Sequence, residues 1–185
     1  MQLGLKDLHM AAVTKNGDQR TYGKPAVMAK AIKVNLSVTF AEGSLYADDA
    51  LAYSAKEFVK GKITLNVADL TNEVIAALLG WEVDRDGVIY AGNEDSEDAP
   101  VVALAWASKK PEGKNRYLWL YEVQFSIPSE SYETKGDQIK ILTPTIEGEF
   151  IKRPNDGRWK ADYVGLPTSS VAQGWFNTVR EFVAN

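Results

Sequence analysis

The chain has 185 residues, of which 25% are charged and 45% hydrophobic, a balance typical of one globular domain with a substantial core. Its formal net charge of −4 argues against a general nucleic-acid or membrane-surface binder, because either would need a basic field. There is no cysteine and the only histidine is His9, which excludes disulfides, thiol nucleophiles and histidine-rich metal centres. We expect neither a signal peptide nor a membrane span.

Two segments alternate strictly between apolar and polar residues, which predicts half-buried β-strands at 31–40 and 61–67. The even positions are apolar in the first segment, and the odd positions are apolar in the second. The polar faces of these two strands carry Lys33, Asn35, Ser37, Thr39, Lys62, Thr64 and Asn66.

Between these strands, residues 41–60 show no clear period, so we expect a long loop there. A connection of that length in a compact domain is usually functional or mobile. It carries apolar side chains that need a partner, either on their own subunit or on another one.

Two helices are predicted in this chain. Thr71 can cap a short helix that runs through Leu79, with Gly80 just past its end. A second helix is predicted from about Ser170 to Phe182, with one of the two serines at 169 and 170 as its cap.

Two further strands follow the first helix. Residues 101–106 form an unbroken apolar run, typical of a strand whose second face is covered by a helix or by a neighbouring subunit. Residues 115–127 alternate, with Leu118 and Leu120 on one face at first and polar residues there later. The other face is expected to carry Tyr117, Trp119, Tyr121, Val123, Phe125 and Ile127.

The remaining signals concern turns. The Asp86–Gly87 pair lies between two short apolar runs and predicts a hairpin. Residues 91–99 form an acidic loop. The apolar period of residues 138–151 changes phase near Thr143 and Pro144, which predicts a bulge or break there. Strands outweigh helices throughout, so we expect one mainly-β domain over residues 1–185 with a minor helical part.

The residue types that catalysis and metal binding require are scarce. A Ser–His–Asp site would have to use His9, and no Gly-x-Ser-x-Gly elbow is present. Asp48 and Asp49 are adjacent and would point to opposite sides of an extended chain, which disfavours a glycosidase pair. The acidic loop lacks EF-hand spacing, and no nucleotide-binding glycine motif occurs. We therefore predict no enzyme, no cofactor and no metal site.

The order and spacing of several segments resemble the major tail (tail tube) proteins of long-tailed phages and prophages of Gram-positive bacteria, of the phi-thirteen type. The segments are residues 4–9 (GLKDLH), 45–49 (LYADD), 61–80, 116–151 and 174–176 (GWF). The resemblance covers nearly the whole chain and depends on the set of segments rather than on one motif.

The resemblance implies a β-sandwich or barrel-like tail tube domain with one short packed helix and a C-terminal helix. Subunits of this type form hexameric rings that stack into a hollow tube, the conduit for DNA ejection. The expected partners are copies of the chain itself, the tail terminator, the tape measure and the distal tail proteins, with DNA passing without specific binding. The expected location is the virion, after synthesis in the cytoplasm of the bacterial host.

In this interpretation two sets of residues are candidate functional surfaces. The polar positions of strands 31–40 and 61–67 would line the lumen or an outer face of the tube. The connection at 41–60 would reach an adjacent ring or fold back on its own subunit. Its candidate contact residues are Leu45, Tyr46, Asp48, Asp49, Leu51, Tyr53 and Phe58.

Two other functions remain open from the residues alone. A monomeric β-sandwich that binds carbohydrate would need tryptophan and tyrosine side chains on loops or on an open face. A small β-rich enzyme would need catalytic groups that the sequence barely supplies.

Overall fold

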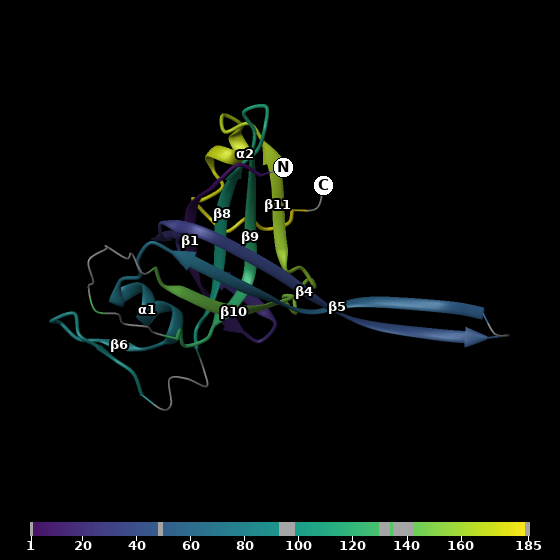
Figure 1. The fold of residues 1–185 in the computed structure, drawn as a ribbon, viewed down its shortest axis with the longest axis horizontal. Helices are drawn as coiled ribbons and strands as arrows, with labels where there is room; N and C mark the ends of the chain where they lie inside the picture. The colour runs from purple at the N-terminus through teal and green to yellow at the C-terminus, as the bar shows by residue number, and fades with distance from the viewer. Residues whose placement is uncertain (1, 48–49, 93–98, 130–133, 135–142, 184–185) are drawn as a thin grey trace.

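The computed structural model describes residues 2–47, 50–92, 99–129, 134 and 143–183 (Figure 1). Within these residues the chain is mainly β, as predicted, with two short helices. In chain order the elements are β1 (Leu5–Asn16), β2 (Gln19–Tyr22), β3 (Ala26–Ala29), β4 (Ala31–Ala47), β5 (Ala50–Val67), α1 (Asn72–Leu79), β6 (Glu82–Val83), β7 (Ile89–Tyr90), β8 (Val101–Lys109), β9 (Asn115–Phe125), β10 (Thr145–Ile151), β11 (Lys160–Gly165) and α2 (Ser170–Gln173).

One antiparallel sheet organises the fold. Its strand order is β2-β1-β8-β9-β10-β5-β4, with β3 also paired to β1 and β11 also paired to β9. Two strands share one edge of β9, since β11 pairs with Asn115–Leu120 and β10 pairs with Glu122–Phe125. The far strand β4 comes back close to β1 without pairing to it. The sheet is therefore strongly curled and has a concave face.

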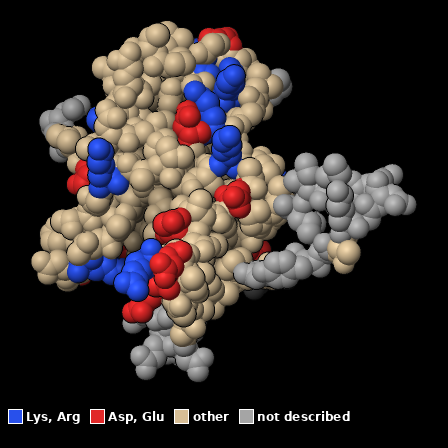
Figure 2. All heavy atoms as spheres, turned by 90° about the vertical axis from the view of Figure 1, so that its left-hand side faces the viewer, with Lys and Arg blue, Asp and Glu red and all other residues tan. Residues whose placement is uncertain are grey.

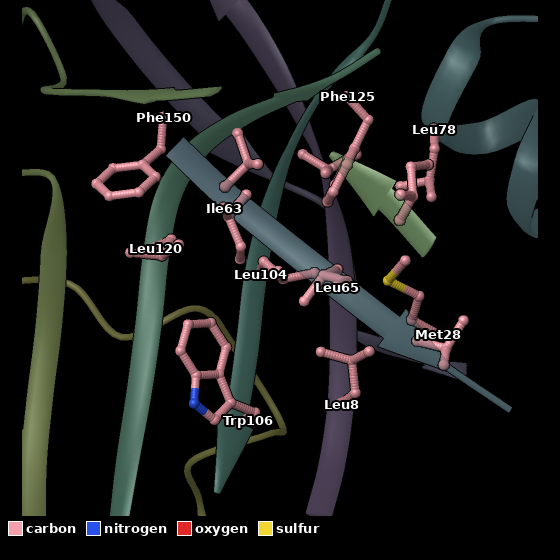
Figure 3. Close-up of a cluster of buried hydrophobic side chains, with 14 of the residues drawn as sticks. Leu8, Met28, Ile63, Leu65, Leu78, Leu104, Trp106, Leu120, Phe125 and Phe150 are labelled. Atoms are coloured by element: carbon pink, nitrogen blue, oxygen red, sulfur yellow. The ribbon is translucent and has the colours of Figure 1, made fainter. Parts of the chain in front are cut away.

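Side chains on the concave face form the larger core, which we call the inner cluster. It joins Leu8 of β1, Leu65 of β5, Leu104 of β8 and Leu120 of β9, which all lie on facing parts of the curled sheet (Figure 3). Each is at most 1% exposed, and burial of a side chain of this size contributes about 1.5–3 kcal/mol before entropic costs. The cluster also contains Leu78 and Leu79 of α1, which covers one end of the sheet.

A second cluster lies on the convex face, and we call it the outer cluster. Its buried members include the small β8 residues Ala103, Ala105 and Ala107, with Trp119 of β9 and Trp175. The indole nitrogen of Trp119 donates to the carbonyl of Trp175 at 3.0 Å. The cover comes from residues 170–183, the C-terminal strap, so the second face of β8 is covered by its own chain and not by a neighbouring subunit.

The predicted C-terminal helix is wrong beyond its first turn. Ser169 caps α2 by accepting from the backbone of Ala172, but the helix ends at Gln173. Gly174, a poor helix former, follows directly, and the chain then continues in turns. These turns place Trp175 and Val179 on the outer cluster, a packing gain that outweighs the helical pattern.

The predicted face of β9 is wrong beyond Tyr121. Tyr117, Trp119 and Tyr121 belong to the outer cluster, but Val123 and Phe125 belong to the inner cluster. The cause is a shift in the β8–β9 register, which adds one residue to β9 and turns every later side chain to the opposite face. Ile127 lies beyond the strand and is exposed.

The other local predictions have mixed outcomes. The helix at α1 is confirmed, with Thr71 accepting from the backbone of Val74 and Gly80 in the left-handed conformation. The hairpin around Asp86–Gly87 is confirmed as β6 and β7. β10 begins directly after Thr143 and Pro144, but residues 135–142 and most of the acidic loop lie outside the described residues.

Candidate functional site

A long hairpin replaces the loop predicted at residues 41–60. β4 continues through Ala47, β5 starts at Ala50, and the two strands pair along their length. Residues 41–47 and 50–57, which we call the hairpin arm, project away from the rest of the molecule (Figure 1). The prediction was wrong because a ribbon surrounded by solvent has no buried face to impose an alternating pattern.

The candidate contact residues occupy the arm and its base. Leu45 pairs with Tyr53, and Tyr46 pairs with Leu51, so these residues from two strands are neighbours across the arm. Asp48 and Asp49 lie outside the described residues. Phe58 is partly buried at the base of the arm, where its ring packs on the core of its own chain.

The predicted polar face exists as one continuous surface. Residues directly opposite each other in an antiparallel pair point to the same side of the sheet. Lys33 lies opposite Asn66, and Asn35 lies opposite Thr64. All seven predicted polar positions therefore share the convex face of β4 and β5, which are Lys33, Asn35, Ser37, Thr39, Lys62, Thr64 and Asn66.

The charges of this face are balanced rather than acidic. Lys60 of β5 pairs with Glu149 of β10 at 2.7 Å, and Lys62 pairs with Glu147 at 2.6 Å. These side chains are about half exposed, so each pair contributes only about 0.2–1 kcal/mol. The paired lysines and glutamates give the face little net charge.

The same balance extends to the base of the arm. Glu57 accepts a hydrogen bond from Lys152 at 2.5 Å, and this bond lowers the pKa of the Glu57 carboxyl. Lys56 likewise lowers the pKa of Glu42, which lies directly opposite it on the other strand of the arm. Among the described residues on the face opposite the arm, charges of both signs are also interspersed (Figure 2).

β4 leaves much apolar surface uncovered. Ile32, Leu36 and Phe40 are 52%, 39% and 45% exposed, although their spacing predicts a half-buried face. No described strand pairs with the outer edge of β4. The backbone N–H and C=O groups that this 17-residue strand directs to that edge therefore have no ladder partner there. Such an edge invites pairing with another chain.

A cleft of about 470 Å³ opens beside this edge. Ile32 and Leu36 of β4 form one wall, and Trp106 and Leu118 contribute apolar surface. The cationic residues Arg116 and Lys160 also line it, and Lys33, which lies on the convex face of the same edge strand, borders it. The sequence did not predict the cleft, because five separate segments form it and no local motif connects them.

One carboxylate partly neutralises the positive charge of the cleft. Asp162 of β11 accepts from Arg116 Nε at 2.9 Å and 3.1 Å through its two oxygens. The hydrogen bonds from Arg116 lower the pKa of Asp162, and Lys160 lies 3.4 Å away. Three cations against one carboxylate leave positive charge in excess.

His9, which a Ser–His–Asp site would have to use, packs against an aromatic ring. His9 stacks on Phe176 with ring centroids 4.5 Å apart, and its Nδ1 lies 2.9 Å from the carbonyl of Asp7. No group of three or more histidine, aspartate or glutamate side chains that could hold a metal ion occurs within the described ranges.

Neither a comparison with models of protein families nor a comparison with curated proteins finds a match for this chain. None of the helices in the described residues is both long and apolar enough to cross a bilayer. Three surfaces are the candidate functional sites, namely the hairpin arm, the free edge of β4 and the cleft beside it.

Proposed function

We propose that the chain is the structural subunit of a phage-type tail tube. Copies assemble into hexameric rings that stack into a hollow conduit for DNA, and the tube is part of the virion. Tail terminator, tape measure and distal tail proteins are its further partners. Such a subunit performs no catalysis and needs no cofactor.

The observation that carries this proposal is the hairpin arm. Seven residues of β4 lie beyond Phe40, and at about 3.3 Å per residue they extend about 23 Å. A two-stranded ribbon of this length is marginally stable in water without further contacts. A neighbouring subunit would provide them, and the unpaired edge of β4 offers a second surface of the same kind.

The charge balance of the convex face supports a channel function. DNA carries a dense negative charge and binds strongly to surfaces that are rich in unpaired lysine and arginine. On this face Lys60 and Lys62 are both paired with glutamates of β10. A lumen lined by such a face would let DNA pass without retaining it.

Shortening the arm tests the proposal. Glu42 and Lys56 lie directly opposite each other, so residues 43–55 can be replaced by Asn-Gly, which forms a tight two-residue hairpin turn. We expect the variant to keep its unfolding transition but to form no rings or tubes in negative-stain electron microscopy and light scattering. The single substitution Gly43→Ala, which meets no atom within 4 Å, is the matched control that keeps the arm. Normal tubes from the shortened variant would contradict the proposal.

The cleft favours one second candidate, a monomeric module that binds a small ligand such as a carbohydrate. Sugar binding usually needs an exposed aromatic face, but Trp106 is only 5% exposed. A strict monomer at all protein and salt concentrations, together with saturable binding of an oligosaccharide in isothermal titration calorimetry, would establish this alternative.

A further inference from the structure

The cleft beside β4 combines two properties that together define a partner. Ile32 and Leu36 expose apolar surface along its wall. Lys33, Arg116 and Lys160 add positive charge in excess of the carboxylate of Asp162. An extended segment with apolar side chains and at least one carboxylate would complement both properties.

The tip of the hairpin arm has this composition. Residues 45–53 read LYADDALAY, with two adjacent aspartates, apolar or aromatic neighbours and no cation. No other described strand connection combines these features with a long projecting support (Figure 1). The tip and the cleft are therefore complementary in charge and in apolar character.

The tip of one chain cannot reach the cleft of the same chain. Leu36 lines the cleft and belongs to the same continuous strand as Ala47, which ends next to the tip. Eleven residues of extended strand separate them, about 35 Å at the usual rise. Folding the tip back would require breaking the β4–β5 ladder, so the partner has to be another molecule.

Building on the proposed function, we propose that the cleft of one subunit receives the hairpin tip of a second copy, whose acidic sequence complements the positive charge of Lys33, Arg116 and Lys160. The contact joins two different surfaces, so it is heterologous and repeats from subunit to subunit. A repeating contact of this kind closes into a ring or continues along an axis, as tube assembly requires.

Charge reversal tests the pairing of tip and cleft. Lys33→Glu with Lys160→Glu, and separately Asp48→Lys with Asp49→Lys, should each raise the concentration needed for assembly about tenfold or more. All four changes together restore opposite charges and should return assembly close to the wild-type level. Lys15→Glu with Lys24→Glu alters the net charge equally at residues that do not line the cleft, and should have little effect. Thermal unfolding of each variant separates loss of assembly from loss of folding.

Site-specific cross-linking provides an independent test, because the chain has no native cysteine. We expect a mixture of Ala50→Cys and Gln2→Cys subunits to form a cross-linked dimer with a short bis-maleimide. Gln2 lines the cleft and Ala50 belongs to the tip. A mixture of Ala50→Cys and Lys15→Cys subunits is the control and should give no such product.

The outcomes distinguish this inference from the proposed function. Wild-type assembly with no cross-link and no effect of Asp48→Lys with Asp49→Lys would overturn the tip-in-cleft contact alone. Weakened assembly in both charge variants without recovery in the combined variant would also overturn it. A wild-type protein that never assembles would overturn the proposed function itself.

Discussion

The ring of Phe58 lies parallel to the indole of Trp159, with centroids 5.2 Å apart and an angle of 4° between the planes. Phe58 belongs to β5 at the base of the hairpin arm, and Trp159 directly precedes β11. The stack therefore joins the base of the projecting hairpin to the segment that enters β11, a strand paired with β9. Phe150 packs on both rings and completes the anchor.

This anchor predicts a marked effect of Phe58→Ala. Truncation removes buried aromatic surface and leaves a cavity, and because Phe58 is only partly buried we expect a loss of about 2–3 kcal/mol. Phe40→Ala, which removes a more exposed ring on the opposite strand, should cost about 1 kcal/mol or less. Urea unfolding measures both values, and equal losses would refute the anchoring role of the stack.

Gly61 is predicted to tolerate no side chain. A Cβ atom at this position would lie 2.0 Å from the ring of Phe150, which is completely buried. We expect Gly61→Ala to destabilise the protein by about 1–3 kcal/mol through overpacking. The loss should shrink when Phe150→Leu is introduced in the same chain, because the smaller side chain makes room. Gly43→Ala is the control and should change stability by less than about 0.5 kcal/mol.

Removing one partner of the buried ion pair between Arg20 and Glu122 should destabilise the protein more than removing both partners. Their side chains are 7% and 1% exposed and lie 2.6 Å apart. Arg20→Met leaves the buried carboxylate of Glu122 without its cationic partner and should lower the free energy of unfolding by about 3–5 kcal/mol. Arg20→Met combined with Glu122→Leu removes both charges and should recover most of that loss. A double variant as unstable as the single one would show that the ion pair itself stabilises the fold.

Ionisation of Tyr22 is expected to destabilise the protein at high pH. Burial is the largest cause that raises the pKa of its phenol from 10.0 to about 12, although a hydrogen bond from Arg153 opposes the shift. The raised pKa means that Tyr22 contributes its full stabilisation below pH 10 and loses it as the pH rises from 10 to 12.

Unfolding in urea at several pH values between 10 and 12 measures this dependence. Tyr22→Phe should make the decline in stability shallower without abolishing it, because burial also raises the pKa of Tyr121. A slope unchanged by the substitution would contradict the role of Tyr22.

Much of the fold could be predicted from local pattern. The alternation of residues 61–67 predicts the last seven residues of β5 correctly, since one face of this part is buried in the inner cluster. Thr71 and Gly80 predict both ends of α1, because capping is a local interaction. The polar positions of β4 and β5 share one face, as their period of two requires.

The errors concern features that local pattern does not encode. The extra residue of β9 follows from its register with β8, a contact between separate segments. The C-terminal strap has helical spacing, but packing of Trp175 on Trp119 determines its path. The cleft beside β4 depends on curling of the whole sheet, which brings Ile32 near Arg116.

The C-terminal strap has a consequence for biosynthesis. Trp119 is fully buried and its indole donates to the carbonyl of Trp175, which lies 56 positions later in the chain. A ribosome makes about 5–20 residues per second, so the aromatic face of β9 stays exposed to solvent for several seconds after β9 has been translated. During this interval the exposed apolar surface makes nascent chains prone to associate with one another. Neighbouring ribosomes on one messenger RNA hold such chains close together, which favours premature association. The outer cluster can be completed only after the segment that carries Trp175 and Val179 has left the ribosome.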